Sequence, residues 1–586
     1  MAPRAGLAVV VVVGLAVALL GPGLGGAPLD DPGEGQHAEI AREVLGGSWL
    51  ALRLNGVRYF DKPPLLYWLT AGSFEIFGFT EWAARLAPLL GALLAVAGTA
   101  LLGVRLLGPG GGVLAGAALL SCALFAAFAR YVRPETLFVA TIQWGFLGLL
   151  WARAPDARTS RGWAVLGGAA LGLASLAKDP LGLLGPLAAV ALAFALSGRL
   201  RPIGTWLPPL GLVLLLVVGL GWYVVASLTQ PSFLWYTVVD NHVLNVTRLR
   251  EFPDEDVPLS ALEFLAAAGF GAFPWILAAA VAVAALLRRR AWRDAAEIPW
   301  VALALWTVGV LAVFTLSRFK LPHYGLPVYP AIALLAARAW RDAGPRSRAL
   351  IVTHLVLFAV IGGVLLWAAR GDGRQFTAAV FGISDVYSRK EAAWGQDAPY
   401  PPWSSLQPLL ARSGIVLLAG AAGLAVAGAA RSTPLAAATV AVAMLTLVPV
   451  VTAGLAATST ARAVRVMAGD IRGRLHGQDV LVLEGPIENA GAVEFYSGHR
   501  PVLLDSTRSV LGIGSTFEDA SATFWSPSRF IEAWASARPP YLLTTRAPGH
   551  SIVATLSPGS VELLFAHNGR WLYRHAPAPG AADRHR

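Results

Sequence analysis

Long apolar runs recur along the chain and alternate with short segments rich in arginine, glycine and proline. A helix of about 20 apolar residues crosses the hydrocarbon core of a bilayer, which is about 30 Å thick. The pattern therefore predicts a polytopic α-helical membrane protein. Its thirteen predicted spans lie near residues 7–27, 84–107, 113–129, 137–151, 163–177, 181–198, 206–228, 262–287, 299–316, 322–337, 349–369, 409–430 and 434–457.

The charges between these spans predict the topology. With the N-terminus on the cytoplasmic side, the cytoplasmic segments hold sixteen basic and four acidic residues. The opposite side, up to residue 460, holds about twenty acidic and sixteen basic residues, which is the asymmetry of the positive-inside rule. The first span also resembles a signal peptide, because Arg4 precedes it and small residues follow at 25–27. Either way, the segment after it is predicted to lie outside.

Composition narrows the class of protein. Of 586 residues, 56% are hydrophobic and 14% are charged, against about 25% charged in a soluble domain, which excludes an ordinary cytosolic enzyme. The net charge of +11 is scattered over short loops rather than gathered on one basic face, so it does not indicate nucleic-acid binding. Cys122 is the single cysteine, which excludes an intrachain disulfide and a CxxC site.

The character of the chain changes near residue 460, so we expect a membrane domain over 1–459 and a C-terminal domain over 460–586. Segments 480–484, 501–505 and 541–545 are predicted to be short strands, and 528–538 an amphipathic helix. Segment 563–574 is predicted to be a hairpin around Asn568-Gly569, a pair that favours a type I′ turn. The odd number of spans places this small α/β domain on the periplasmic side.

Ionisable residues gather at the outer ends of the predicted spans, and charges close to a membrane core are functional candidates. Of the 46 basic residues only four are lysines, Lys62, Lys178, Lys320 and Lys390. The first three are in this outer set, although the positive-inside bias could also leave lysines there by chance. The set comprises Asp30, Asp31, Glu34, His37, Glu39, Lys62, Arg130, Arg133, Glu135, Lys178, Asp179, Asp240, His242, Arg318, Lys320 and His323.

The first outer loop, residues 28–83, carries Asp61-Lys62-Pro63-Pro64. Two consecutive prolines prevent a continuous helix and hold the backbone extended before the next apolar stretch. Asp61 and Lys62 are thereby expected to be fixed at the membrane surface. The alternative is an interfacial elbow in which Lys62 only reaches toward lipid phosphates.

Five segments together resemble the ArnT-like and protein-mannosyltransferase-like membrane glycosyltransferases with the GT-C fold. They are DPGEGQHAEIARE (31–43), LNGVRYFDKPP (54–64), RYVRPET (130–136), LAKDP (176–180) and LSRFKLPHYGLP (316–327). The resemblance implies transfer of a sugar from a polyprenyl phosphate, most often undecaprenyl phosphate, to a lipid A, glycan or protein acceptor. The transfer would take place at the outer face of a bacterial inner membrane and would invert the anomeric carbon.

The resemblance also implies roles for individual residues. Lys62 matches the family's phosphate-contacting lysine, and Arg133, Lys178, Lys320 and Tyr324 are further candidates to bind the donor phosphate. Cations placed where charge develops on the leaving phosphate would stabilise the transition state. Asp61 and His242 match positions that look metal-binding in the aminoarabinose transferase, so a divalent cation such as zinc or magnesium is conceivable.

The catalytic base is left open among three acids. Relatives usually carry an acidic pair where this chain has Gly33-Glu34, so Asp31 or Glu34 could take the role of the absent acid, and Glu135 matches the acid of the second loop. The departure at Gly33 also leaves open a non-catalytic homologue.

Two other functions remain alternatives. A transporter or flippase of a lipid-linked substrate generally has broken helices and ionisable residues near the bilayer midplane, whereas here the charges form a one-sided rim. A receptor or scaffold would leave that rim unexplained. The acidic segment 251–256 is either a solvated turn or part of a lid over the donor.

Overall fold

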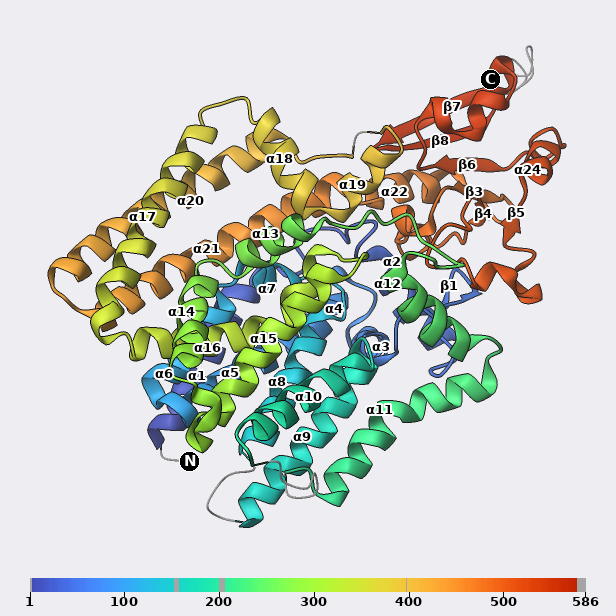
Figure 1. Cartoon of the computed structure of the whole chain (residues 1–586). Helices are drawn as coiled ribbons and strands as arrows, with labels where there is room; N and C mark the ends of the chain where they lie inside the picture. The colour runs from blue at the N-terminus through green and yellow to red at the C-terminus, as the bar shows by residue number, and fades with distance from the viewer. Residues whose placement is uncertain (1–2, 152–156, 200–205, 397, 577–586) are drawn as a thin grey trace.

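The computed structural model describes residues 3–151, 157–199, 206–396 and 398–576 (Figure 1). Its larger part is a bundle of helices, and a six-stranded sheet lies at one end. The bundle comprises α1 (Pro3–Leu20), α5 (Leu86–Leu107), α6 (Pro109–Leu120), α7 (Ala123–Phe128), α8 (Glu135–Trp151), α9 (Ala157–Ala177), α10 (Leu181–Leu196), α11 (Pro209–Thr229), α13 (Ala261–Gly271), α14 (Trp275–Arg288), α15 (Ile298–Leu316), α16 (Tyr329–Arg341), α17 (Ser347–Ala368), α20 (Trp403–Ala429) and α21 (Thr433–Arg462).

Every predicted span coincides with one of these helices or with two consecutive ones. Six described helices are long and apolar enough to cross a membrane, or seven if the pair α13 and α14, bent by 104°, forms one span. Of the remaining predicted spans, α9 has 21 residues but is not among these six, and three others are helices of 16 to 18 residues. The last two are interrupted, because Ser121-Cys122 separates α6 from α7 and Pro322 and Pro327 lie in a 3₁₀ turn before α16. The structure is thus a helical membrane protein, and the count of thirteen stays a prediction.

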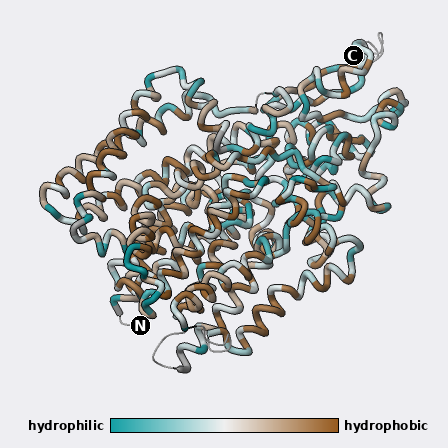
Figure 2. The backbone as a smooth tube through the Cα atoms, viewed as in Figure 1, coloured by the Kyte–Doolittle hydropathy of each residue, from teal (hydrophilic) through white to brown (hydrophobic). Residues whose placement is uncertain are grey.

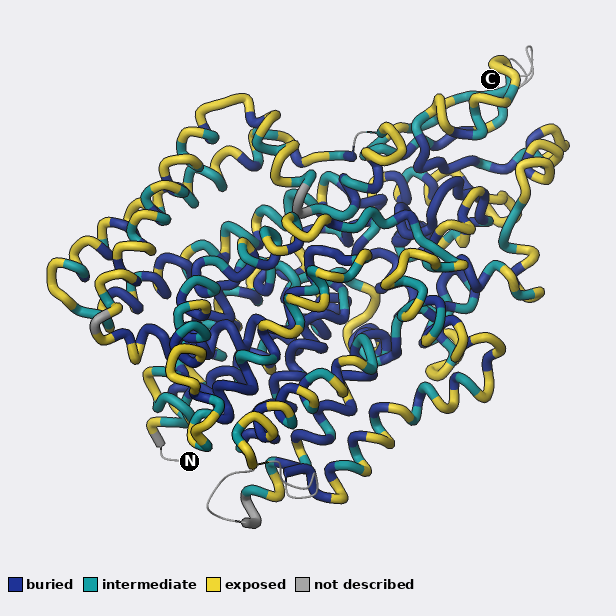
Figure 3. The backbone as a smooth tube through the Cα atoms, in the orientation of Figure 1, coloured by how far each residue is buried: buried dark blue, intermediate teal, exposed yellow. Residues whose placement is uncertain are grey.

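Several helices present apolar side chains to the outside. On α11, α17 and α20 only 28% of the most apolar window is buried, and Figures 2 and 3 show these helices as hydrophobic yet largely exposed. Such faces are stable only against lipid or another apolar surface. Within the bundle, α8 and α9 meet at Gly148 and Gly167, where a Cβ on Gly148 would lie 2.4 Å from the carbonyl oxygen of Trp163. Small residues allow this close approach of two helix backbones.

The first outer loop is an ordered unit rather than a simple connection. It contains α2 (Gly35–Gly46), the strands β1 (Arg53–Leu54) and β2 (Val57–Arg58), α3 (Leu65–Phe77) and α4 (Glu81–Ala84). The two strands form a hairpin in which Asn55 and Gly56 have φ of 56° and 75°, as a type I′ turn requires. Helix α3 begins directly after Pro63-Pro64, so the prolines place Asp61 and Lys62 just before a helix.

The C-terminal elements form the α/β unit that the pattern predicts. Its sheet has the order β5-β4-β3-β6-β8-β7, with the first four strands parallel and β7 and β8 antiparallel. The strands are β3 (Leu481–Glu484), β4 (Val502–Leu504), β5 (Phe524–Trp525), β6 (Tyr541–Thr544), β7 (Val561–His567) and β8 (Arg570–His575), and the helices are α22 (Arg465–Arg474), α23 (Val493–Ser497) and α24 (Pro527–Trp534). The predicted boundary at 459 falls inside α21, which continues to Arg462.

This α/β unit packs on the first outer loop, as Figure 1 shows beside α2 and β1. A Cβ on Gly35 would lie 2.5 Å from the backbone nitrogen of Ala492, so the two backbones are in direct contact. The buried carboxylate of Asp31 accepts hydrogen bonds from the backbone N–H groups of Val464 (3.2 Å) and Ala492 (3.0 Å). Asp31 therefore joins the first loop to the C-terminal unit.

Asp31→Ala is expected to loosen this contact. The substitution leaves two buried N–H groups without acceptors, each costing about 1–3 kcal/mol, so amides around Val464 and Ala492 are expected to exchange hydrogen faster. Asp519→Ala is the matched control, because its ion pairs with Arg53 and Arg58 are exposed and such pairs contribute about 0–1 kcal/mol. Equal exchange rates in both variants and the wild type would contradict the role given to Asp31.

Candidate functional site

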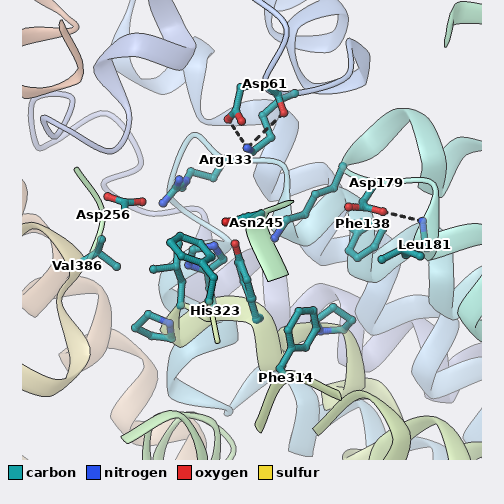
Figure 4. Close-up of a pocket in the computed structure, with 18 of the residues that line it drawn as sticks. Asp61, Arg133, Phe138, Asp179, Leu181, Asn245, Asp256, Phe314, His323 and Val386 are labelled. Atoms are coloured by element: carbon teal, nitrogen blue, oxygen red, sulfur yellow. Dashed lines mark hydrogen bonds and ion pairs between the residues drawn. The ribbon is translucent and has the colours of Figure 1, made fainter. Parts of the chain in front are cut away.

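A cavity of about 1080 Å³ lies where the ends of several helices meet the first loop and the C-terminal unit. Charged and polar side chains from many separate segments line one end of it (Figure 4). They include Asp30, His37, Asp61 and Lys62 of the first loop, Tyr131 and Arg133 before α8, Lys178 and Asp179 between α9 and α10, His242, Arg250 and Asp256 after α11, His323 and Tyr324 before α16, Asp385, Lys390 and Arg462, and Glu488 of the C-terminal unit.

The other part of the cavity is an apolar groove between α10 and α15. Its lining residues recur every three or four positions, so they share one face of each helix. They are Leu181, Leu184, Ala188 and Leu192 on α10 and Trp306, Val310 and Val313 on α15. Leu184 and Val313 remain 55% and 63% exposed, so the groove is open along its side. The site thus joins an ionic end to a laterally open apolar channel.

Three of the predicted phosphate ligands, Lys62, Arg133 and Lys178, meet at the ionic end. The ammonium of Lys62 is hydrogen-bonded to Asp61, and that of Lys178 lies 3.1 Å from Oε1 of Glu135. The Nε of Arg133 is buried and has no hydrogen-bond partner in the described chain. Together these cations form a positive pocket that can bind an anionic head group.

Glu135 does not line the described cavity but holds two residues that do. Its Oε1 is 3.1 Å from Nζ of Lys178 and 3.4 Å from Nε2 of His323. The ammonium of Lys178 also lies 5.2 Å from the ring centre of Tyr324, in cation–π geometry. Glu135 and Tyr324 therefore position Lys178 from two sides.

Like Glu135, the other two predicted catalytic acids and one predicted phosphate ligand lie outside the described lining of the cavity. Asp31 binds backbone groups of the C-terminal unit, as shown above. Glu34 forms a fully buried ion pair with Arg85, at 2.8 and 2.5 Å, and also accepts the backbone N–H of Val132 at 2.9 Å. Lys320 donates to the carbonyl of Ser317 at 2.5 Å. Each of these side chains is thus bonded away from the place where the cations meet.

The predicted metal ligands Asp61 and His242 both line the cavity. However, Nε2 of His242 is 2.8 Å from Oδ2 of Asp179, its Nδ1 contacts the carbonyl of Thr237, and Asp61 binds Lys62 and Asn241. Within the described ranges, neither belongs to a set of three potential ligand atoms within 4.8 Å of one another. As arranged here the two side chains do not fit a metal, and a divalent cation stays a prediction.

Several cavity residues were not predicted to bind the phosphate or to act as the base. His37 is buried with Nδ1 2.9 Å from the hydroxyl of Tyr67 and Nε2 unpartnered in the described chain; burial and the nearby Arg133 lower the pKa of His37 to about 3, so its ring is neutral. Asp30 and Asp256 are acids beside motifs that the sequence does single out. Lys390, on α19 (Val386–Ala393), is the fourth lysine, and the rarity of lysine was the signal that could have found it.

The acidic segment 251–256 is not a solvated turn. Glu255 is buried, 2.7 Å from Nη2 of Arg546 and 3.7 Å from Nζ of Lys390, and Lys390 lies 3.4 Å from Oε1 of Glu488. Asp256 lines the cavity. The segment therefore covers the ionic end of the cavity and is bound there by α19 and the C-terminal unit.

Comparison with known proteins relates this chain to membrane glycosyltransferases. The family model described as dolichyl-phosphate-mannose-protein mannosyltransferase matches residues 61–223, which include Lys62, Arg133 and Lys178. An undecaprenyl phosphate-alpha-4-amino-4-deoxy-L-arabinose arabinosyl transferase of Pseudomonas fluorescens Pf0-1 is 31% identical over 353 residues, 58% of each chain. One of Pseudomonas aeruginosa LESB58 is 31% identical over 323 residues, 53% of this chain and 55% of the relative. The matched region thus spans little more than half the length of these relatives.

The fold is shared over nearly the whole chain. The crystal structure of ArnT from Cupriavidus metallidurans bound to undecaprenyl phosphate superposes with a TM-score of 0.78 at 24% identity, covering 96% of this chain and 97% of that one. The apo structure of the same protein gives a TM-score of 0.77. These findings confirm the family resemblance that the sequence motifs indicate.

Proposed function

We propose that this chain, which belongs to the ArnT-like and protein-mannosyltransferase-like glycosyltransferases with the GT-C fold, transfers a sugar from a polyprenyl phosphate to an acceptor. The observation that carries this proposal is the junction of a cation cluster, Lys62, Arg133 and Lys178, with an open apolar groove. A polyprenyl phosphate has the same two parts, a charged head group and a long apolar chain. The groove would take the chain from the lipid and the cluster would take the phosphate.

The cluster suits the chemistry of the leaving group. As the bond between the anomeric carbon and the phosphate oxygen breaks, its electron pair moves to the phosphate, which becomes a dianion. Fixed cations at that point stabilise the transition state more than the bound donor. Attack from the opposite face of the sugar inverts the anomeric carbon. Glu135 keeps Lys178 oriented toward the phosphate without itself taking part in the transfer.

The side of the membrane follows from the predicted topology. The excess of basic residues on the cytoplasmic side supports a periplasmic position for the cavity and the C-terminal unit. The named activity of the Pseudomonas relatives makes an aminoarabinose donor the first to test, with lipid A, glycans and proteins as acceptor classes. Transport is disfavoured because the ionisable residues of the cavity gather at helix ends rather than across the midplane.

The test is a transfer assay with the purified protein in lipid nanodiscs. Undecaprenyl phosphate donors that carry a labelled sugar are combined with lipid and protein extracts of the outer membrane. The aminoarabinose donor is tested first. Label is expected to appear in one extract class together with free undecaprenyl phosphate. Movement of intact donor across vesicles without any release of undecaprenyl phosphate would instead support a flippase and contradict the proposal.

A further inference from the structure

Three acids follow α1, and the structure engages two of them in fixed contacts. Asp31 binds the backbone of the C-terminal unit, and Glu34 is paired with Arg85 in the interior. A carboxylate that accepts a proton during catalysis must reach the reacting group within hydrogen-bond distance. Since Asp31 and Glu34 are absent from the described lining of the cavity, neither meets this condition.

Asp30 does meet it. Its side chain lines the cavity and is 3% exposed. The backbone N–H of Asp30 donates to Glu34 Oε2 at 3.1 Å, so the buried pair of Glu34 and Arg85 fixes the position of Asp30. Oδ2 accepts a hydrogen bond from the hydroxyl of Tyr131, while Oδ1 is buried and has no hydrogen-bond partner in the described chain. A buried carboxylate oxygen without a donor is costly, and an incoming hydroxyl would supply one.

Gly33 is the point at which the first loop packs against Tyr131. A Cβ at Gly33 would lie 1.6 Å from the hydroxyl oxygen of Tyr131, so no side chain fits there. The same hydroxyl binds Asp30. Tyr131 thus fills the space beside Gly33 and holds the carboxylate of Asp30 in the cavity.

We propose that Asp30 is the catalytic base and Tyr131 its positioning residue, so that the Asp30 and Tyr131 pair replaces the acid absent at Gly33. This inference rests on the proposed function. The acceptor is of a class that enters with its proton, a hydroxyl or amine. Its oxygen or nitrogen bonds to the anomeric carbon, the bond to the phosphate oxygen breaks with its electron pair on the phosphate, and the proton passes to Oδ1 of Asp30. An acceptor that is already anionic would need no such base.

The surroundings of Asp30 set the direction of its pH dependence. Burial raises the pKa of Asp30, Arg462 and the Tyr131 hydrogen bond lower it, and Glu34 and Asp385 raise it. The net pKa is above the ordinary value of 3.8. Because the base works as a carboxylate, kcat is expected to fall as the pH drops through this raised pKa.

Two variants test the proposal. Asp30→Asn keeps the shape and is expected to lower kcat about 100-fold while leaving the affinity for undecaprenyl phosphate unchanged. Tyr131→Phe removes a hydrogen bond that lowers the pKa of Asp30, so the acidic limb of the kcat profile is expected to move to higher pH. Glu75→Gln is the matched control, because Glu75 is an exposed acid of the first loop that does not line the described cavity, and this variant should retain full activity.

The outcomes separate the two levels of the account. Suppose that the wild type transfers sugar. An undiminished kcat in Asp30→Asn would then overturn the role of Asp30 without contradicting the transferase activity. An acidic limb of the kcat profile that does not move in Tyr131→Phe would do the same. Absence of transfer by the wild type with every donor and extract would instead remove the proposed function on which the role depends.

Discussion

Lys62→Ala is expected to lower the rate of sugar transfer about 10²–10³-fold, the usual effect of removing one group that stabilises charge in a transition state. Lys62 stands at the ionic end of the cavity, where Pro63-Pro64 and the start of α3 fix its backbone. An ammonium has three N–H donors, so its contact with Asp61 leaves donors for a phosphate. No other ammonium in the described structure holds this place in the first loop.

The measurement is kcat for release of undecaprenyl phosphate. Arg248→Gln serves as the matched control, because Arg248 is an exposed basic residue of the same outer surface that does not line the described cavity. Lys62→Arg keeps the charge with a different geometry and is expected to fall between wild type and alanine. A loss smaller than about tenfold in Lys62→Ala would show that Lys62 does not face the leaving group.

Arg85→Met is expected to destabilise the fold by about 3–5 kcal/mol, because it leaves the charge of Glu34 buried without a cation. The guanidinium is 4% exposed and the carboxylate 0%. Arg85 also donates to the backbone carbonyls of Leu24, Ala27 and Pro28, so the turn that follows α1 loses its partners as well. Since Glu34 fixes Asp30, the first loop is expected to lose its order before the bundle melts.

Thermal unfolding in detergent, followed by tryptophan fluorescence, measures this effect. Arg465→Met is the control, since its pair with Glu81 is 56% exposed on the arginine side and such surface pairs contribute about 0–1 kcal/mol. The double variant Glu34→Gln with Arg85→Met is expected to recover part of the loss, because it removes the buried charge. Equal melting of Arg85→Met and the wild type would contradict the structural role of this pair.

Hydropathy located the helices well and their interruptions poorly. Apolar runs persist wherever a helix faces lipid, so each predicted span coincides with helix. The break at Ser121-Cys122 and the 104° bend before Trp275 depend on packing between segments, which a window of single residues does not contain. Strands β3, β4 and β6 and the hairpin at Asn568-Gly569 were predictable because their signals are local: Asn568 and Gly569 have φ of 50° and 71°. The short strands β1, β2 and β5 were not predicted.

The residues of the candidate site were likewise only partly predictable from the sequence. Lys62 and Lys178 were identifiable because nearly all other basic residues of the chain are arginines. Arg133 was identifiable because it belongs to the motif RYVRPET. Which acid enters the cavity could not be predicted, because it depends on contacts between distant segments. Arg85 and Glu34 are 51 residues apart, and Tyr131 and Asp30 are 101 residues apart. Lys390 escaped the prediction because it lies on α19, far along the chain from the motifs, and reaches the cavity beside the C-terminal unit.

The most direct measurement of the central claim is the affinity of the protein in nanodiscs for undecaprenyl phosphate compared with undecaprenol, the same lipid without phosphate. It requires no knowledge of the sugar or the acceptor. If Lys62, Arg133 and Lys178 bind the phosphate, the wild type binds undecaprenyl phosphate at least about tenfold more tightly, since a charge-assisted hydrogen bond contributes about 1.5–3 kcal/mol. The double variant Lys62→Ala with Lys178→Ala is expected to lose most of this preference, because Arg133 is then the one cation of the cluster that remains. Equal affinities for the two lipids in the wild type would contradict the account.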